Sequence, residues 1–127
     1  MNWFRFVVIF LSCVALSVGS VSRAEDCVRF AKAELELDTD AIVGGPMNIA
    51  AVEEKSLAEI AACSHCPQKP FGYLNAKWEE FKSEMRPGDC VVFFRSGRTS
   101  WNQLMGVEGY ALMRGEKLVR KMITGVS

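Results

Sequence analysis

Apolar residues recur at helical spacing between residues 25 and 37. A helix drawn over this range has charged side chains on one side and, on the other, four apolar residues: Cys27, Phe30, Ala31 and Leu35. Two aspartates and a Gly-Gly-Pro run come next, and both are typical of a chain that is leaving a helix. The pattern predicts a first helix over residues 25–37.

A second helix is indicated by a capping box at Ser56-Leu-Ala-Glu59. In this motif the serine and the glutamate satisfy the first free amides of a helix, so we expect the helix to begin at Ser56. It runs to Cys63 and is stopped by Pro67. Residues 47–52, which precede it, fit either a short strand or the start of a helix.

A third helix is predicted from Asn75 onward, because Trp78, Phe81 and Met85 recur at spacings of three and four residues. Residues 67–73, between the second and third helices, contain two prolines. Each proline disfavours the helical conformation in the residue before it, so this segment is expected to be an extended connector.

The β signals are concentrated in the C-terminal part of the chain. Residues 90–94 are apolar on both faces, as expected of a central strand. Residues 101–105 suit a short helical turn, and residues 109–114 and 117–124 suit two strands joined by a tight turn. Together these elements predict an α+β fold, in which two to three N-terminal helices pack on a C-terminal three-stranded antiparallel sheet.

The N-terminal segment has the features of an export signal. Arg5 precedes an apolar run over residues 6–18, shorter than the about 20 residues that a membrane-spanning helix needs. Ser22-Arg-Ala24 then places small side chains at the two positions that a signal peptidase reads. We expect residues 1–24 to be a signal peptide and residues 25–127 to form one small domain. The alternative is an uncleaved amphipathic anchor, which would be the only part to contact a membrane.

Four cysteines follow the expected cleavage point: Cys27, Cys63, Cys66 and Cys90. A fifth, Cys13, lies inside the apolar run, and apolar residues continue past it, so we do not expect it to be lipidated. An even number of cysteines in a short exported chain predicts two disulfide bonds, for which three pairings exist. The spacing does not choose among them. We favour bonds from Cys27 and Cys90 to the Cys63/Cys66 corner, because these would tie both ends of the domain to its middle.

The charge of the expected mature chain is close to balanced. Without Arg5 and Arg23, thirteen basic residues face fifteen acidic ones. A nucleic-acid-binding domain usually has a clear basic excess, so no nucleic-acid partner is expected. The export signal and the cysteines together predict a periplasmic or secreted protein.

Cys63-Ser-His65-Cys66 resembles the active dithiol of exported thiol–disulfide oxidoreductases. In those enzymes the first cysteine lies at a helix N-terminus, where the helix dipole stabilises its thiolate. Here Cys63 is expected at the C-terminal end of a helix, where the dipole disfavours a thiolate. We therefore expect a structural disulfide, with a thiol-active protein as the alternative.

Zinc binding and haem attachment are two further interpretations of these residues. The four cysteines, or His65 in place of one of them, could bind zinc, but an oxidising compartment favours disulfides over thiolate ligands. Haem attachment requires a histidine directly after the second cysteine of the pair, and Pro67 stands there. We expect neither a metal nor a cofactor.

Several motifs resemble the papain-like cell-wall endopeptidases: a cysteine that opens the first helix, an Arg-Pro-Gly-Asp turn leading into a strand over residues 86–94, and a following strand over residues 109–113. The resemblance implies that Cys27 is the nucleophile and that the catalytic histidine falls near residues 107–108. Valine and glutamate stand there, and the chain's one histidine, His65, precedes the turn. Without a base the thiol has no partner to deprotonate it. The resemblance is therefore either local convergence on a common turn or the mark of a degenerate relative that has lost catalysis.

The candidate binding surface comes from two segments. Phe71 and Tyr73 lie on the connector, which cannot bury itself. Arg95 and Arg98 follow the central strand and could bind an anionic partner, and the ring of Trp101 could line a groove. We therefore expect an exported, non-enzymatic binding or accessory domain with an unknown protein or envelope component as partner.

The mature protein is predicted to begin within a few residues of Glu25. Intact-mass analysis of protein recovered from the extracytoplasmic fraction checks this, and the mass of the full 127-residue chain in that fraction would contradict it.

Overall fold

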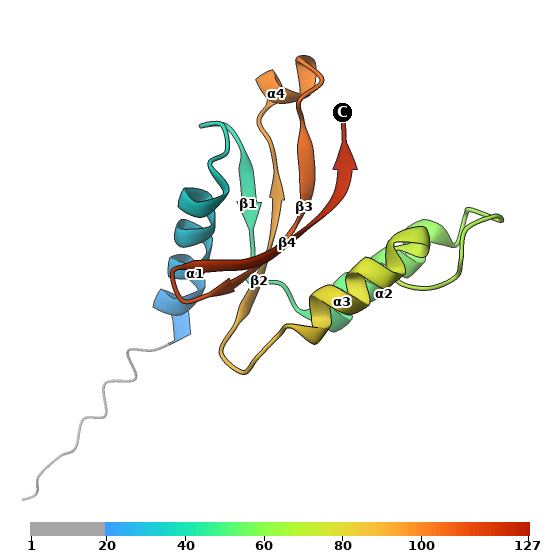
Figure 1. Ribbon diagram of the computed structural model, residues 1–127, viewed down its shortest axis with the longest axis horizontal. Helices are drawn as coiled ribbons and strands as arrows, with labels where there is room; N and C mark the ends of the chain where they lie inside the picture. The colour runs from blue at the N-terminus through green and yellow to red at the C-terminus, as the bar shows by residue number, and fades with distance from the viewer. Residues whose placement is uncertain (1–19) are drawn as a thin grey trace, which may run out of the picture.

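The computed structural model describes residues 20–127, which form an α+β fold with one four-stranded antiparallel sheet in the order β1-β2-β3-β4 (Figure 1). The helix α1 lies on one face of the sheet, and α2 and α3 lie on the other. The elements in chain order are α1 (Ser20–Leu35), β1 (Ile42–Gly44), α2 (Ile49–Ile60), the 3-10 helix η1 (Gly72–Leu74), α3 (Asn75–Ser83), β2 (Cys90–Arg95), α4 (Arg98–Asn102), β3 (Val107–Arg114) and β4 (Lys117–Val126).

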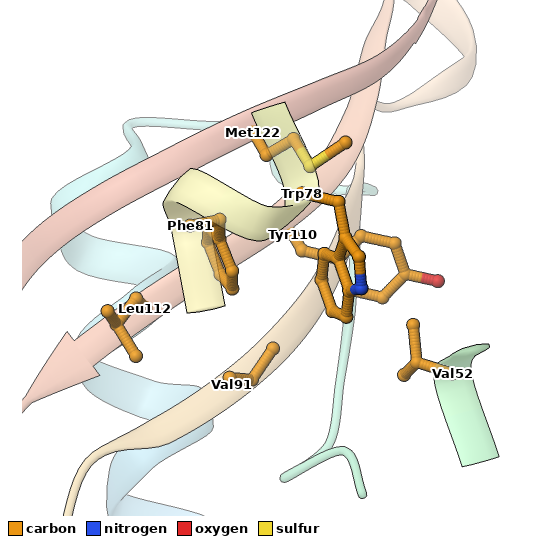
Figure 2. Close-up of a cluster of buried hydrophobic side chains, with 7 residues drawn as sticks. All are labelled: Val52, Trp78, Phe81, Val91, Tyr110, Leu112 and Met122. Carbon is orange, nitrogen blue, oxygen red and sulfur yellow. The ribbon is translucent and has the colours of Figure 1, made fainter. Parts of the chain in front are cut away.

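The two central strands, β2 and β3, are buried on both faces because their successive side chains point to opposite sides of the sheet. One face carries the α2–α3 core, drawn in Figure 2: Val52, Trp78, Phe81, Val91, Tyr110, Leu112 and Met122. The other face carries the α1 core: Cys27, Ala31, Val92, Phe94, Ala111 and Met113. Burying one large apolar side chain contributes about 1.5–3 kcal/mol, so these two clusters are the main source of stability.

The α+β class is confirmed, with one strand more than the sequence indicated. The extra strand, β1, has only three residues, too few for an alternating pattern to stand out, and it pairs with β2 through Ile42 and Arg95 at one end. The expected strands over residues 109–114 and 117–124 extend to Val107–Arg114 and Lys117–Val126.

The capping-box prediction for the second helix is wrong. The helix α2 begins at Ile49, seven residues earlier, and its N-terminus is capped by Asn48, whose Oδ1 accepts a hydrogen bond from the Ala51 amide at 3.2 Å. Ser56 is instead buried in the middle of the helix, where its Oγ accepts a hydrogen bond from the Phe71 amide at 2.6 Å. The serine therefore ties the following connector to α2.

The helices α2 and α3 are linked by one partly buried carboxylate. Glu53 Oε1 accepts hydrogen bonds from Lys82 Nζ at 2.6 Å and from Trp78 Nε1 at 2.9 Å, and these donors, Lys82 first, lower the pKa of Glu53. The pair α2–α3 projects beyond the sheet as a helical hairpin (Figure 1).

The disulfide pairing we favoured is wrong. The bonds are Cys27–Cys90, with Cα atoms 6.7 Å apart, and Cys63–Cys66, with Cα atoms 5.4 Å apart. Cys27 is on the buried face of α1, whereas Cys63 follows α2 on the opposite side of the sheet, so the sheet separates them. The first bond links α1 to β2, and the second closes the turn after α2.

Residues 1–19 lie outside the described part of the chain, and with them Cys13, Arg5 and the apolar run of the expected signal peptide. The expected cleavage site at Ser22-Arg-Ala24 falls within α1, which begins at Ser20. Between residues 20 and 127, no helix is both long enough and apolar enough to cross a bilayer.

The two disulfides are predicted to contribute unequally to stability. The Cys27–Cys90 bond joins residues 63 positions apart and the Cys63–Cys66 bond joins residues three apart. Because a longer closed loop restricts the unfolded chain more, the Cys27→Ser/Cys90→Ser variant should lose about 2–4 kcal/mol of unfolding free energy, and the Cys63→Ser/Cys66→Ser variant about 2 kcal/mol or less. Urea denaturation measures both. Equal losses, or a larger loss for the second variant, would contradict the prediction.

Candidate functional site

Two hollows lie side by side at the end of the sheet where β2 finishes and β3 begins. The first, the α2 cleft, has a volume of about 430 Å³ and lies between α2 and the sheet. The second, the Trp101 hollow, has a volume of about 640 Å³ and lies beside α4. Arg95 lines both of them. The register of the strands places Ile42, Arg95, Glu108 and Gly125 in one row across this end.

The α2 cleft has apolar walls and polar groups at one side. Its apolar lining comes from α2, the connector and β2: Val52, Ile60, Phe71, Leu74 and Phe93. Its polar lining comes from α2, β2, β3 and β4: Lys55, Ser56, Glu59, Arg95, Glu108, Tyr110 and Thr124.

Tyr110 is the most deeply buried polar side chain in this cleft that lacks a partner. Its ring packs edge-on against Phe71, with centroids 5.6 Å apart, and against Phe93, with centroids 5.7 Å apart, and only 7% of the residue is exposed. Figure 2 shows its hydroxyl pointing away from the rest of the α2–α3 core. The hydroxyl makes no hydrogen bond to any residue in the described range, although it lines the cleft.

Two carboxylates act on the Tyr110 hydroxyl from different walls of the cleft. Burial raises the pKa of Tyr110, and the negative charges of Glu59 and Glu108 raise it further. Glu59 lies 3.9 Å from Lys55 Nζ in an exposed pair, whereas Glu108 accepts a 2.8 Å hydrogen bond from Arg95 Nη1 and is less exposed, at 29%. The phenol therefore keeps its proton to a higher pH than an exposed tyrosine does.

Arg95 forms the wall between the two hollows. Its guanidinium donates to Glu108 on the side of the α2 cleft, and its Cζ lies 4.3 Å from the centroid of the Trp101 ring on the other side. A guanidinium held over an indole face in this way gains a cation–π interaction. Arg95 is thus fixed by two partners while its side chain is still 45% exposed.

The Trp101 hollow depends on two aspartates that hold α4. Asp40 Oδ2 accepts the Arg98 amide at 3.0 Å, and Asp38 Oδ2 accepts the Ser100 hydroxyl at 2.6 Å, which lowers the pKa of Asp38. The Trp101 ring lies against Gly106, where a Cβ atom would come within 2.5 Å of it. The buried Trp101 Nε1 has no hydrogen-bond partner among residues 20–127.

Of the five residues expected to form a binding surface, four line the two hollows and one, Tyr73, lines neither. Arg95, Arg98 and Trp101 line the Trp101 hollow together. Phe71 is partly buried in the α2 cleft and in the α2–α3 core, because its amide is bound by Ser56 and its ring packs on Trp78. Tyr73 is exposed on η1, away from both hollows.

Sequence reasoning missed Tyr110, Glu59 and Glu108. Tyr110 lies in a predicted strand, whose pattern does not set it apart from its apolar neighbours. Its hydroxyl was the available signal, since a buried tyrosine normally needs a partner for that group. The two glutamates come from elements far apart in the sequence, and the sequence pattern does not show that they meet at one cleft.

The Cys63–Cys66 turn is held by several interactions besides the disulfide. Gln68 Nε2 donates to the carbonyl oxygens of Ile60, Cys63 and Cys66 at 3.4, 3.3 and 3.0 Å. The Tyr73 hydroxyl donates to the His65 carbonyl at 2.6 Å. Cys63 follows the C-terminal end of α2, and its amide donates to the Ile60 carbonyl at 2.9 Å, so the helix dipole there opposes a thiolate.

The residues implied by the papain-like resemblance do not meet. Cys27 is buried and bonded to Cys90, which pairs with Met113 near the end of β3. Residues 107–108 are at the beginning of the same eight-residue strand. At about 3.3 Å per residue, the two positions are on the order of 20 Å apart.

No family model matches the chain, and no curated protein or solved structure matches it either. Within residues 20–127, no group of three or more histidine, cysteine, aspartate or glutamate side chains is arranged to hold a metal ion.

Replacing Tyr110 with phenylalanine is predicted to reduce the alkaline sensitivity of the fold. Because the pKa of Tyr110 is raised in the folded protein, the unfolded chain releases this proton first, and the wild type should lose stability as pH rises above about 10. Tyr110→Phe should keep the wild-type stability at pH 7, since the hydroxyl has no partner to lose, and should show a smaller loss above pH 10. Urea midpoints at pH 7 and at several alkaline values measure the difference. Parallel curves for the two proteins would contradict it.

Proposed function

We propose that this chain is an exported, non-enzymatic binding domain that acts in the periplasm or after secretion, and that its partner is a protein at or outside the cell envelope. Its binding end is the end of the sheet that carries the α2 cleft and the Trp101 hollow. The proposal includes removal of the signal segment, after which the mature domain contacts no membrane.

The observation that carries this proposal is the clustering of exposed apolar residues beside the two hollows. Four of the large exposed apolar side chains belong to this end: Ile42, Leu104, Met105 and Val126. Ile42 pairs with Arg95 in the row across this end of the sheet. Leu104 and Met105 lead into β3, and Val126 pairs with Val107 at the start of β3. Exposed apolar residues grouped around hollows that contain polar groups are typical of a protein-binding surface.

The two disulfides support an oxidising, exported environment for this domain. The observations favour a binding role over thiol chemistry, because Cys63 follows a helix C-terminus and Gln68 holds the turn closed around the bond. They favour it over hydrolysis, because Cys27 is a buried disulfide cysteine.

The proposal predicts that a charge placed in the binding end weakens capture of the partner. Ile42, 59% exposed, lies at this end, whereas Leu57, 38% exposed, lies on α2 and lines neither hollow. Ile42→Glu should reduce capture about tenfold or more, because a glutamate in the centre of an interface must be desolvated, and Leu57→Glu should leave it unchanged.

The measurement is quantitative affinity capture from an envelope extract of the source cells, with protein matured in its own compartment as bait. The captured protein is identified by mass spectrometry and its affinity for the wild type and both variants is then measured with purified components. Equal affinity for all three proteins, or no reproducible partner, would overturn the proposal.

A further inference from the structure

We propose that Leu104 is the anchor residue of the binding end and that its side chain inserts into an apolar pocket of the protein partner. The inference rests on the proposed function and names what the partner must present at the point of contact. Leu104 and Met105 together form the Leu104 tip, which lies between α4 and β3.

The backbone at Leu104 has a conformation that proteins usually reserve for glycine. Its φ is 58°, in the left-handed region, where the backbone crowds the Cβ atom of any other residue. The Leu104 amide donates to the Trp101 carbonyl at 3.3 Å, and the Met105 amide donates to the Ser100 carbonyl at 2.8 Å. These two bonds close α4 as a Schellman motif, whose left-handed position is most often glycine and sometimes asparagine. A leucine at this position therefore destabilises the fold.

The side chain of Leu104 does not offset this strain within the described part of the chain. It belongs to neither apolar cluster, and the residue is 77% exposed. Two other non-glycine residues between 20 and 127 have a positive φ, Glu36 and Phe71. Phe71 is bound by Ser56 and packs on Trp78, and Glu36 exposes a charged side chain, which water solvates well. Leu104 alone of the three combines a strained backbone with an apolar side chain in solvent, which points to a role outside the chain.

The Leu104 tip is held rigidly from behind. Met105, its second residue, is 72% exposed. The amide of the next residue, Gly106, donates to Ser127 Oγ at 2.8 Å, and the Trp101 ring lies against Gly106. These contacts fix the chain on both sides of the two apolar side chains. A rigid projection loses little conformational freedom on binding, so more of the contact free energy contributes to affinity.

The shape and the charges of this region define the surface that fits the tip. Two large apolar side chains that project from the chain fit a concave apolar pocket, as the anchor residues of an interface do. The charges beside them are balanced, because Arg95 is bonded to Glu108 and Asp40 accepts the amide of Arg98. A domain that binds a lipid surface usually adds a basic excess to its apolar residues. The balance of charges favours a protein pocket over a lipid surface.

Substitutions at Leu104 should change stability and affinity in opposite directions. Leu104→Gly removes both the strain and the side chain, so it should raise the midpoint of thermal unfolding by about 2–4 °C and weaken binding of the purified partner about tenfold or more. Leu104→Asn, which tolerates the left-handed region, should weaken binding to the same extent. Leu104→Met keeps a long apolar side chain, and its affinity should stay within about threefold of the wild type.

Glu36→Gly is the matched control, because it relieves a positive φ at an exposed residue that lines neither hollow. It should raise the unfolding midpoint in the same way and leave the affinity unchanged. Wild-type affinity in Leu104→Gly, or a lower unfolding midpoint for that variant, would overturn the inference. An equal loss of affinity in Glu36→Gly would also overturn it, because relief of strain alone would then explain the loss.

Photo-cross-linking in the source cells identifies what Leu104 contacts. A leucine analogue with a diazirine in its side chain is incorporated at the leucine positions, and mass spectrometry locates each cross-link. We expect cross-links from Leu104 to apolar residues of one protein, and none from Leu57, which lies on α2 and lines neither hollow. Cross-links from Leu104 to lipid or to a second copy of this chain, or no cross-links from Leu104, would overturn the inference.

The capture experiment separates this inference from the proposed function. If partner capture is lost in Ile42→Glu but kept in Leu104→Gly, the binding domain stands and the inference about Leu104 fails. If neither variant changes capture, the proposed function fails as well.

Discussion

The two central strands must be covered on both faces, and the rest of the fold follows from this constraint. Val91 and Leu112 point to α2 and α3, while Val92 and Ala111 point to α1, so neither layer of helices can be removed without exposing a cluster of apolar side chains. One of the two layers, α1, is a single helix, and it is joined to β2 by the Cys27–Cys90 bond. A domain of this length buries a limited share of its surface, so the covalent link compensates for a small core.

The same constraint produces the two hollows. The helices cover the middle of the sheet, but the ends of β2 and β3 extend past this cover, and the strand pattern there changes from buried apolar residues to Arg95 and Glu108. The hairpin α2–α3 projects beyond the sheet (Figure 1). The α2 cleft is lined by residues of α2 and of the strands β2, β3 and β4. Tyr110 belongs to both regions: its ring completes the core and its hydroxyl faces the cleft.

The periodicity of the sequence was sufficient to predict the α+β class, the third helix and the doubly buried strand over residues 90–94. The predicted start of the second helix was wrong, because one capping motif in the sequence was followed while a different residue caps the helix. Ser56 and Glu59 fit a capping box, but Asn48 caps the helix earlier and Ser56 binds the amide of Phe71 instead. Disulfide pairing and the meeting of Glu59 with Glu108 depend on how distant elements pack, which spacing along the chain does not encode.

The turn after α2 bears on how this protein survives outside the cytosol. Extracytoplasmic proteases cut exposed segments that can unfold locally by several residues to enter the active site. Residues 61–71 are such an exposed segment, yet their backbone is bound by Gln68 at the carbonyls of Cys63 and Cys66, by the Tyr73 hydroxyl and by the bond between Cys63 and Cys66. Cleavage there would require these interactions to break together, so the projecting end of the hairpin can remain accessible to solvent without becoming a site of degradation.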